Sequence, residues 1–146
     1  MRCALSCVLA AIVGAAAGCS EADPAISVSI AGQFRRSAGG NVDLVEANPG
    51  EWDRVCVLGP YSDNAAAKRT LGFAWDVEGR TPIRRNDGIA VLLFVRGKEV
   101  TEHIEHPRNL GDFVPNSGKC IARANARFYQ ASETKEKPAG LYPKTQ

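Results

Sequence analysis

The sequence lacks most of the short patterns that mark an enzyme or a metalloprotein. It contains two histidines and has no CxxC pair, no GxSxG elbow and no glycine loop with Walker or Rossmann spacing. Those patterns supply, in turn, redox or zinc ligands, a serine nucleophile and a phosphate cradle. Without them the sequence gives no support to a catalytic site, and we expect neither catalytic residues nor a cofactor.

Runs of a single charge sign are also missing. The net charge is +2, and the closest approach to a run, KEK at residues 135–137, mixes both signs. A nucleic-acid-binding protein concentrates Lys and Arg on one face, so we expect no nucleic acid among the partners. The composition, 45% hydrophobic and 23% charged, is typical of one folded domain and too apolar for a disordered chain.

The N-terminal segment has the composition of a signal peptide. One cation, Arg2, precedes an apolar stretch of small residues from Cys3 to Ala17, and acidic residues return at Glu21. The stretch is shorter than the roughly 20 residues that a membrane-spanning helix needs. Residues 1–18 are therefore predicted to be a signal peptide that is removed on export.

The end of this segment resembles a lipobox, the bacterial motif that directs diacylglycerol to a cysteine. Ala17 and Gly18 fit the motif, and Ala16 stands where leucine is preferred. Cys19 then takes the place of the lipid acceptor. An ordinary signal-peptidase cleavage is the alternative, with free secretion into the periplasm and Cys19 as a small apolar residue at the end of the signal.

The lipobox resemblance also implies a cellular location. Residues 19–24 would form a lipidated tether, and the lipid on Cys19 would make the membrane a partner of the protein. Ser20, in place of an aspartate, implies sorting to the outer membrane, with the domain facing the periplasm. Diacylglycerol together with an N-acyl chain such as palmitate would anchor the protein stably.

The other cysteines form an even set. Cys3 and Cys7 lie in the predicted signal peptide, and Cys19 is the candidate for lipid, which leaves Cys56 and Cys120. In an oxidising envelope this pair is predicted to form a disulfide. A redox or metal site is the alternative, but two isolated cysteines make an incomplete zinc set.

Hydrophobic periodicity predicts helices and strands in the body of the chain. Ile26, Ile30 and Phe34 recur at helical spacing, although ISVSI also alternates as a strand would. The apolar run IAVLLFV predicts a central strand buried on both faces, and Gly97-Lys98 predicts a hairpin turn. The predicted elements are a helix over 25–36, a strand over 52–58, a helix over 62–71, strands over 89–95 and 99–106, and a last strand over 119–130.

This order of elements predicts an α+β fold with a single disulfide. An antiparallel sheet of about four strands should carry one or two helices on one face. The disulfide should join the first and last strands of the sheet, or one of them to a nearby loop. The domain should span residues 25–130, followed at 131–146 by a flexible tail rich in polar residues.

The stretch EHIEH, residues 102–106, is the best metal candidate, because histidines and carboxylates are both metal ligands. On a strand, however, His103 and His106 are an odd number apart and point to opposite faces, which makes them weak candidates. We therefore expect no metal site. His103 should lie on the solvent face with Thr101 and Glu105, and His106 should make a hydrogen bond at the strand end.

A hydrolase would need a serine, a histidine and an acid in one place. Ser62, Ser117, His106 and Asp112 supply such groups without a recognisable motif. Convergence of His106, Asp112 and a serine in a concave pocket would favour this alternative. A pairing of Cys56 with His106 would need a free thiol, which the predicted disulfide excludes.

Two loops carry features that suit anions. RTPIRR, residues 80–85, could bind phosphate groups of lipid or lipopolysaccharide, but a solvated loop is the simpler interpretation. GPYSDN, residues 59–64, leads into a helix N-terminus, but Asp63 and turn chemistry explain this run without a ligand. The sequence alone assigns no ligand-binding residue.

Four stretches, EWDRVCVLGPY, DGIAVLLFVRGKEV, EHPRNLGDF and GKCIARANARF, resemble a group of small proteobacterial lipoproteins of unknown function. These proteins carry a similar Trp-Asp-Arg-Val-Cys segment, a Gly-Pro-Tyr and a later Cys, and the likeness covers residues 42–128. It implies a secreted, lipid-anchored single domain and brings no activity with it.

We therefore expect a non-enzymatic envelope lipoprotein that binds a small ligand or another envelope protein. One alternative is an envelope hydrolase or a protein inhibitor. Another is a structural or stress-related envelope protein without a dedicated ligand.

Overall fold

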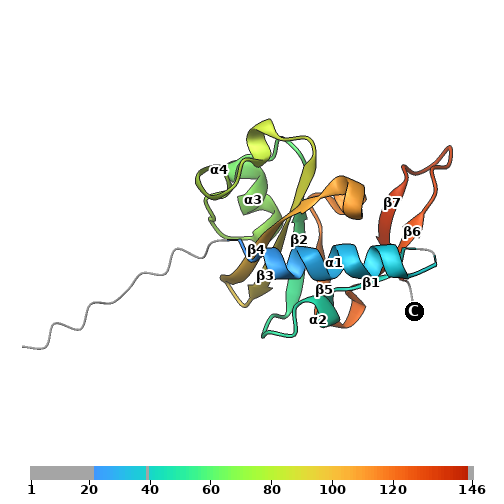
Figure 1. Cartoon of the computed structure of the whole chain (residues 1–146). Helices are drawn as coiled ribbons and strands as arrows, with labels where there is room; N and C mark the ends of the chain where they lie inside the picture. The colour runs from blue at the N-terminus through green and yellow to red at the C-terminus, as the bar shows by residue number, and fades with distance from the viewer. Residues whose placement is uncertain (1–21, 39, 145–146) are drawn as a thin grey trace, which may run out of the picture.

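The fold comes from a computed structural model that describes residues 22–38 and 40–144 (Figure 1). The predicted signal peptide and Cys19 lie outside these residues. The described part of the chain forms four α-helices, a four-stranded sheet and a three-stranded sheet, both antiparallel. The predicted α+β class and the Cys56–Cys120 disulfide are confirmed.

The four-stranded sheet has the strand order β4-β3-β2-β5. Its strand β3 is the predicted apolar run, and every residue of β3 except Arg96 is buried. Gly97, with a φ of 61°, then turns the chain into β4, in a conformation that residues with a Cβ rarely adopt. The strands span Arg54–Leu58 (β2), Ile89–Arg96 (β3), Glu99–Pro107 (β4) and Cys120–Ala122 (β5).

Helix α1 (Pro24–Arg36) follows the predicted apolar spacing, and ISVSI therefore lies in a helix and not in a strand. The Asp23 carboxylate accepts the Ala25 N–H at 2.8 Å, and a proline occupies the first helical position. Ile26 and Ile30 are buried on the side of the helix that faces the sheet. Local capping and apolar spacing agree, so the helix forms where the sequence predicts it.

Helix α3 ends at Leu71 as predicted and begins at Asn64, two residues after the predicted start. Asp63 accepts the Ala66 N–H at 2.7 Å, and Gly72 ends the helix in the left-handed conformation. The short helices α2 and α4 were not predicted, and each is capped by the aspartate that precedes it. Among the described residues, none of the helices is long and apolar enough to cross a membrane. The bounds are Leu44–Ala47 (α2), Asn64–Leu71 (α3) and Val77–Arg80 (α4).

Helices cover both faces of the four-stranded sheet, whereas the sequence predicted helices on one face. Alternate residues of β3 enter two separate cores. The first core lies on the face covered by α1 and the second sheet, and the second core lies on the face covered by α3 and α4. The prediction of a single covered face is wrong because β3 is apolar on both sides, so each side needs its own cover. From β3, Ala90, Leu92 and Phe94 join the first core, and Ile89, Val91, Leu93 and Val95 join the second.

The predicted last strand over 119–130 is also wrong, because a 3₁₀ turn at Arg123–Asn125 divides it. The Arg123 N–H donates to the Asp53 carbonyl at 2.9 Å, and its guanidinium lies 4.6 Å from the centroid of the Trp52 ring. Beyond this turn the chain leaves β2 and enters a second sheet with the order β1-β6-β7. Its strands span Val42–Asp43 (β1), Arg127–Ala131 (β6) and Gly140–Pro143 (β7).

Strand β7 lies within the segment 131–146 that the sequence predicted to be a flexible tail. Leu141 is fully buried in the first core, and its N–H donates to the Asp112 carbonyl at 2.7 Å. The Leu141 carbonyl accepts from the Asn116 side chain at 2.8 Å. Most residues around β7 are polar, so the local sequence does not indicate that Leu141 is buried. The prediction is therefore wrong for residues 140–143, and the fold continues past residue 130.

Replacement of Leu141 by alanine should test the structural role of β7. Removing a fully buried leucine leaves a cavity in the first core and should lower the free energy of unfolding by about 2–5 kcal/mol. Val28→Ala, on the exposed side of α1, is the control and should change stability by less than about 0.5 kcal/mol. Urea titration of both variants measures the difference, and equal small effects would contradict the buried position of Leu141.

Candidate functional site

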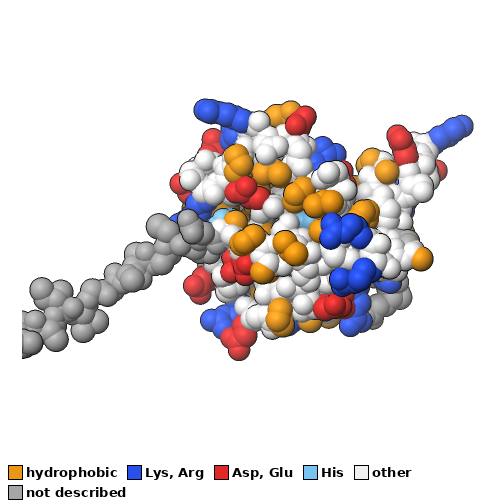
Figure 2. Space-filling view, viewed as in Figure 1, with side chains coloured by type: hydrophobic (Ala, Val, Ile, Leu, Met, Phe, Trp, Pro, Cys, Tyr) orange, Lys and Arg blue, Asp and Glu red, His pale blue; other side chains and the backbone are white. Residues whose placement is uncertain are grey.

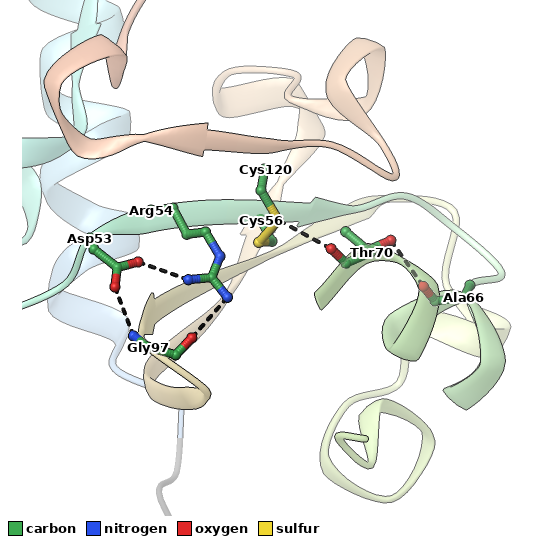
Figure 3. The surroundings of a disulfide bond; sticks show 7 residues. All are labelled: Asp53, Arg54, Cys56, Ala66, Thr70, Gly97 and Cys120. Carbon is green, nitrogen blue, oxygen red and sulfur yellow. Dashed lines mark hydrogen bonds and ion pairs between the residues drawn. A yellow bond between two sulfur atoms is a disulfide. The ribbon is translucent and has the colours of Figure 1, made fainter. Parts of the chain in front are cut away.

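The disulfide joins two neighbouring strands of the four-stranded sheet (Figure 3). Cys56 in β2 lies opposite Cys120 in β5, with a Cα–Cα separation of 4.0 Å, as in a closely spaced antiparallel pair. Cys56 is buried, and the Cys120 sulfur lies 3.3 Å from the Thr70 carbonyl oxygen in α3. The bridge holds the short strand β5 in place, and it closes a sequence separation of 64 residues, worth about 4 kcal/mol in the chain-entropy model.

Figure 3 also shows how the tip of the β3–β4 hairpin is fastened to β2. Arg54 donates to the Gly97 carbonyl at 3.0 Å and to the Asp53 carboxylate at 2.9 Å. The other oxygen of Asp53 accepts the Gly97 N–H at 2.7 Å, which together with Arg54 lowers the pKa of Asp53. These contacts explain the WDRVC stretch by structure, without a ligand.

His103 is buried, although the sequence placed it on the solvent face. It lies on the same side of the sheet as α3 and α4. Its ring packs against the Trp75 ring in a T-shaped arrangement, with a centroid distance of 5.3 Å. Burial lowers its pKa, and the positive charge of Arg80 adds to this effect. Its Nε2 has no hydrogen-bond partner among the described residues. The prediction is wrong because both faces of the sheet are covered, so no solvent face remains at this position.

His106 is fully buried on the opposite side of β4. Its Nε2–H donates to the Leu110 carbonyl at 3.2 Å, since a carbonyl can only accept. Nδ1 is then the acceptor for the Ser27 hydroxyl, which lies 2.9 Å away. Burial lowers the pKa of His106, and the Leu110 carbonyl and the Asp112 charge partly oppose this shift. His106 thus joins α1 to β4, in addition to the predicted hydrogen bond at the strand end.

The two histidines therefore point to opposite faces, as the odd spacing predicts. His103 pairs with Leu93 of the second core, and His106 pairs with Ala90 of the first. Within the described ranges, no three His, Cys, Asp or Glu side chains come close enough to hold a metal ion together.

The groups named for a hydrolase come together only in part. Asp112 is held by Arg108, whose Nε and Nη2 both donate to one oxygen at 3.1 and 2.8 Å. The other oxygen of Asp112 accepts the Val114 N–H at 2.9 Å. The serine at His106 is Ser27, which the sequence analysis did not single out. Its position at the edge of the apolar stripe of α1 is the one signal that could have indicated it.

The two anion-friendly loops lie side by side in the structure. The Tyr61 N–H donates to the Ile83 carbonyl at 2.9 Å, and Arg84 lies 3.8 Å from Asp63 and 3.4 Å from Glu78. These ion pairs are exposed and contribute little to stability. A polar hollow of about 510 Å³ adjoins the RTPIRR loop. Arg84 is held by Asp63 and Glu78, and Arg85 is the other cation that lines this hollow.

A second hollow, of about 360 Å³, lies where the end of α1 meets β1 and β6. Three cations line it, Arg36, Arg127 and Lys144, together with the carboxylates of Asp43 and Glu46. Figure 2 shows basic side chains gathered over the C-terminal half of α1, with acidic ones beneath them. The polar residues Gln33, Ser37 and Asn41 and the apolar residues Val42 and Phe128 complete the lining. We call this the α1–β6 hollow. Its volume falls within the range of small-ligand sites, and charged and polar side chains make up most of its lining.

Replacement of His103 by leucine should flatten the acid dependence of stability. The folded-state pKa of both histidines is lowered, so the unfolded chain binds protons first as the pH falls below the ordinary value of 6.5. Stability is therefore fully present above that pH and is lost below it. His103→Leu removes one of these two contributions and an unpartnered buried nitrogen.

Urea titrations between about pH 7.5 and pH 5 measure this effect. His103→Leu should show a shallower loss of stability towards acid and no loss at the upper pH. His106→Leu is the matched variant, and it should lower stability at the upper pH by about 1–3 kcal/mol because the Ser27 and Leu110 partners lose their hydrogen bonds. The same slope in wild type and His103→Leu would contradict the assignment.

No family model matches this chain, and no curated protein or solved structure matches it. The resemblance to small lipoproteins therefore stays a prediction.

Proposed function

We propose that this protein is an envelope lipoprotein, anchored in the outer membrane and facing the periplasm, that works as a non-enzymatic binding module. The observation that carries the proposal is the Cys56–Cys120 disulfide. It occupies both cysteines of the folded body, so Cys19 has no cysteine there to pair with. Lipid on Cys19 accounts for this odd cysteine at the end of an apolar leader.

The position of α1 supports an anchor close to the domain. The helix begins at Pro24, so only residues 20–23 separate it from Cys19. A fully extended chain covers at most about 3.6 Å per residue, which limits this tether to about 18 Å. A lipid on Cys19 would therefore keep the domain next to the membrane surface.

The burial of the histidines supports a role without catalysis. A general base has to reach the group from which it takes a proton, yet His103 and His106 are both buried. Asp112 is committed to Arg108 and to a backbone N–H. The two charged hollows, at the RTPIRR loop and at α1–β6, are lined by other residues. These features suit a surface that binds rather than one that converts a substrate.

Replacement of Cys19 by serine should release the protein from the membrane. Without a thiol no thioether to diacylglycerol can form, so the variant should move from the detergent phase to the aqueous phase in a phase-separation assay and should not incorporate labelled palmitate. Cys7→Ser is the matched control, because Cys7 lies inside the predicted signal peptide and its loss should leave partitioning unchanged. Retention of Cys19→Ser in the detergent phase would contradict the anchor.

A hydrolase is the second candidate, and the Ser27–His106 contact is the observation that favours it. A serine that donates to a neutral histidine is the first half of a nucleophilic site. A fluorophosphonate probe, which labels activated serines, tests this candidate directly. Under the binding-module proposal, wild type and Ser27→Ala should label equally weakly, and Ser29→Ala serves as the neighbouring control. Labelling that depends on Ser27 alone would favour the hydrolase.

A further inference from the structure

We propose that the α1–β6 hollow binds a small organic carboxylate. This names the ligand class of the binding module and rests on that proposed function. Three properties of the hollow support this: the pairing of the charges around it, the residues that form its floor, and the net charge that remains for a ligand.

Two of the three cations at the hollow are uncommitted. Arg36 and Lys144 are exposed, and their side chains make no ion pair or hydrogen bond with other described residues. The Arg36 guanidinium lies over Gly32, one helical turn earlier, where the absence of a side chain leaves room for it. Both groups are therefore available to a ligand without breaking a contact in the protein.

The carboxylate of Asp43 does not compete with a ligand for these cations. One of its oxygens accepts the Val45 and Glu46 N–H groups at 2.9 and 3.4 Å, which caps α2. The other oxygen accepts from Arg127 Nε at 2.8 Å. Hydrogen bonds from Arg127 and these backbone groups lower the pKa of Asp43 in spite of its partial burial, so it stays ionised. Asp43 and Arg127 thus neutralise each other.

The remaining charges select a ligand with one negative charge. Besides the Asp43–Arg127 pair, the charged residues of the lining are Arg36, Lys144 and Glu46. Two cations and one carboxylate give a net charge of +1, which a ligand with one negative charge would neutralise. A carboxylate carries one negative charge, whereas a phosphate monoester carries about 1.5 to 2 near neutral pH. The planar guanidinium of Arg36 also matches a carboxylate through two parallel hydrogen bonds.

The floor of the hollow is formed by two residues of the first core. Val42 of β1 and Phe128 of β6 are neighbours across the two strands, and both line the hollow. Val42 is 2% exposed and Phe128 is fully buried, so they form a closed floor, and a ligand would meet the charged and polar side chains around it. The volume of about 360 Å³ lies at the lower end of the range for small-ligand sites, about 300–1,000 Å³.

Benzoate and its neutral counterpart benzamide provide the sharpest test, because they share shape and apolar body and differ in charge. The full chain carrying Cys19→Ser, exported and labelled with ¹⁵N, is titrated with each compound and followed by NMR. Benzoate should shift amide signals of residues 33–46 and 127–144, and benzamide should bind at least about tenfold more weakly. Phenyl phosphate distinguishes a general anion site, and it should bind more weakly than benzoate.

Variants on the rim connect the binding to named residues. Arg36→Gln and Lys144→Gln should each weaken benzoate binding by about tenfold and leave benzamide unchanged. Glu46→Gln should tighten benzoate binding. Arg35→Gln, an exposed neighbour in α1 that does not line the hollow, is the matched control and should have no effect. All four substitutions are of charged side chains with solvent access, so the fold should persist.

Equal binding of benzoate and benzamide, an absence of shifts at the hollow, or unchanged affinity in Arg36→Gln and Lys144→Gln would overturn the carboxylate site. Stronger binding of phenyl phosphate would replace it with a phosphate site. The titrations use a chain without the lipid acceptor, so their outcome is independent of the partitioning of Cys19→Ser. A failed ligand and a failed anchor can therefore be told apart.

Discussion

The burial of β3 on both faces is the constraint on which the rest of the structure depends. A strand without polar positions cannot lie at a solvent surface, so each face of the four-stranded sheet has to be covered. Helix α1 and the second sheet cover one face, and α3 and α4 cover the other. Residues far from β3 in the chain, such as Leu141 in β7, are recruited to complete the first core.

This double cover also determines the environment of the charged and polar groups. It buries His103 and His106 on opposite sides of β4 and lowers the pKa of both, which removes them from the surface where chemistry on a substrate takes place. The Ser27 hydroxyl satisfies the nitrogen of His106 and joins α1 to the sheet. The Cys56–Cys120 bridge fastens the short edge strand β5, whose three residues offer little pairing of their own. His106, Ser27 and the two cysteines thus make contacts that connect elements of the fold.

The proposed ligand site lies where the end of α1 meets the second sheet. The α1–β6 hollow exists because the chain turns at Arg123 and sends β6 away from β2. Its cations come from the end of α1, from β6 and from the residue after β7, which are distant in sequence. The proposed tether leads into the other end of the same helix, so α1 would connect the membrane anchor to the ligand site.

The sequence by itself determined the features that depend on local signals. The caps at Asp63 and Gly72 define α3, the apolar run defines β3, Gly97 defines the hairpin, and counting cysteines predicts the Cys56–Cys120 bridge. Only the tertiary structure decided where residues 119–131 change sheets, that Leu141 is buried, that His103 has no solvent face, and that Arg36 and Lys144 line the same hollow. Each of these depends on contacts between distant segments, whose free energy comes from covering the two faces of β3 and leaves no periodic mark in the local sequence.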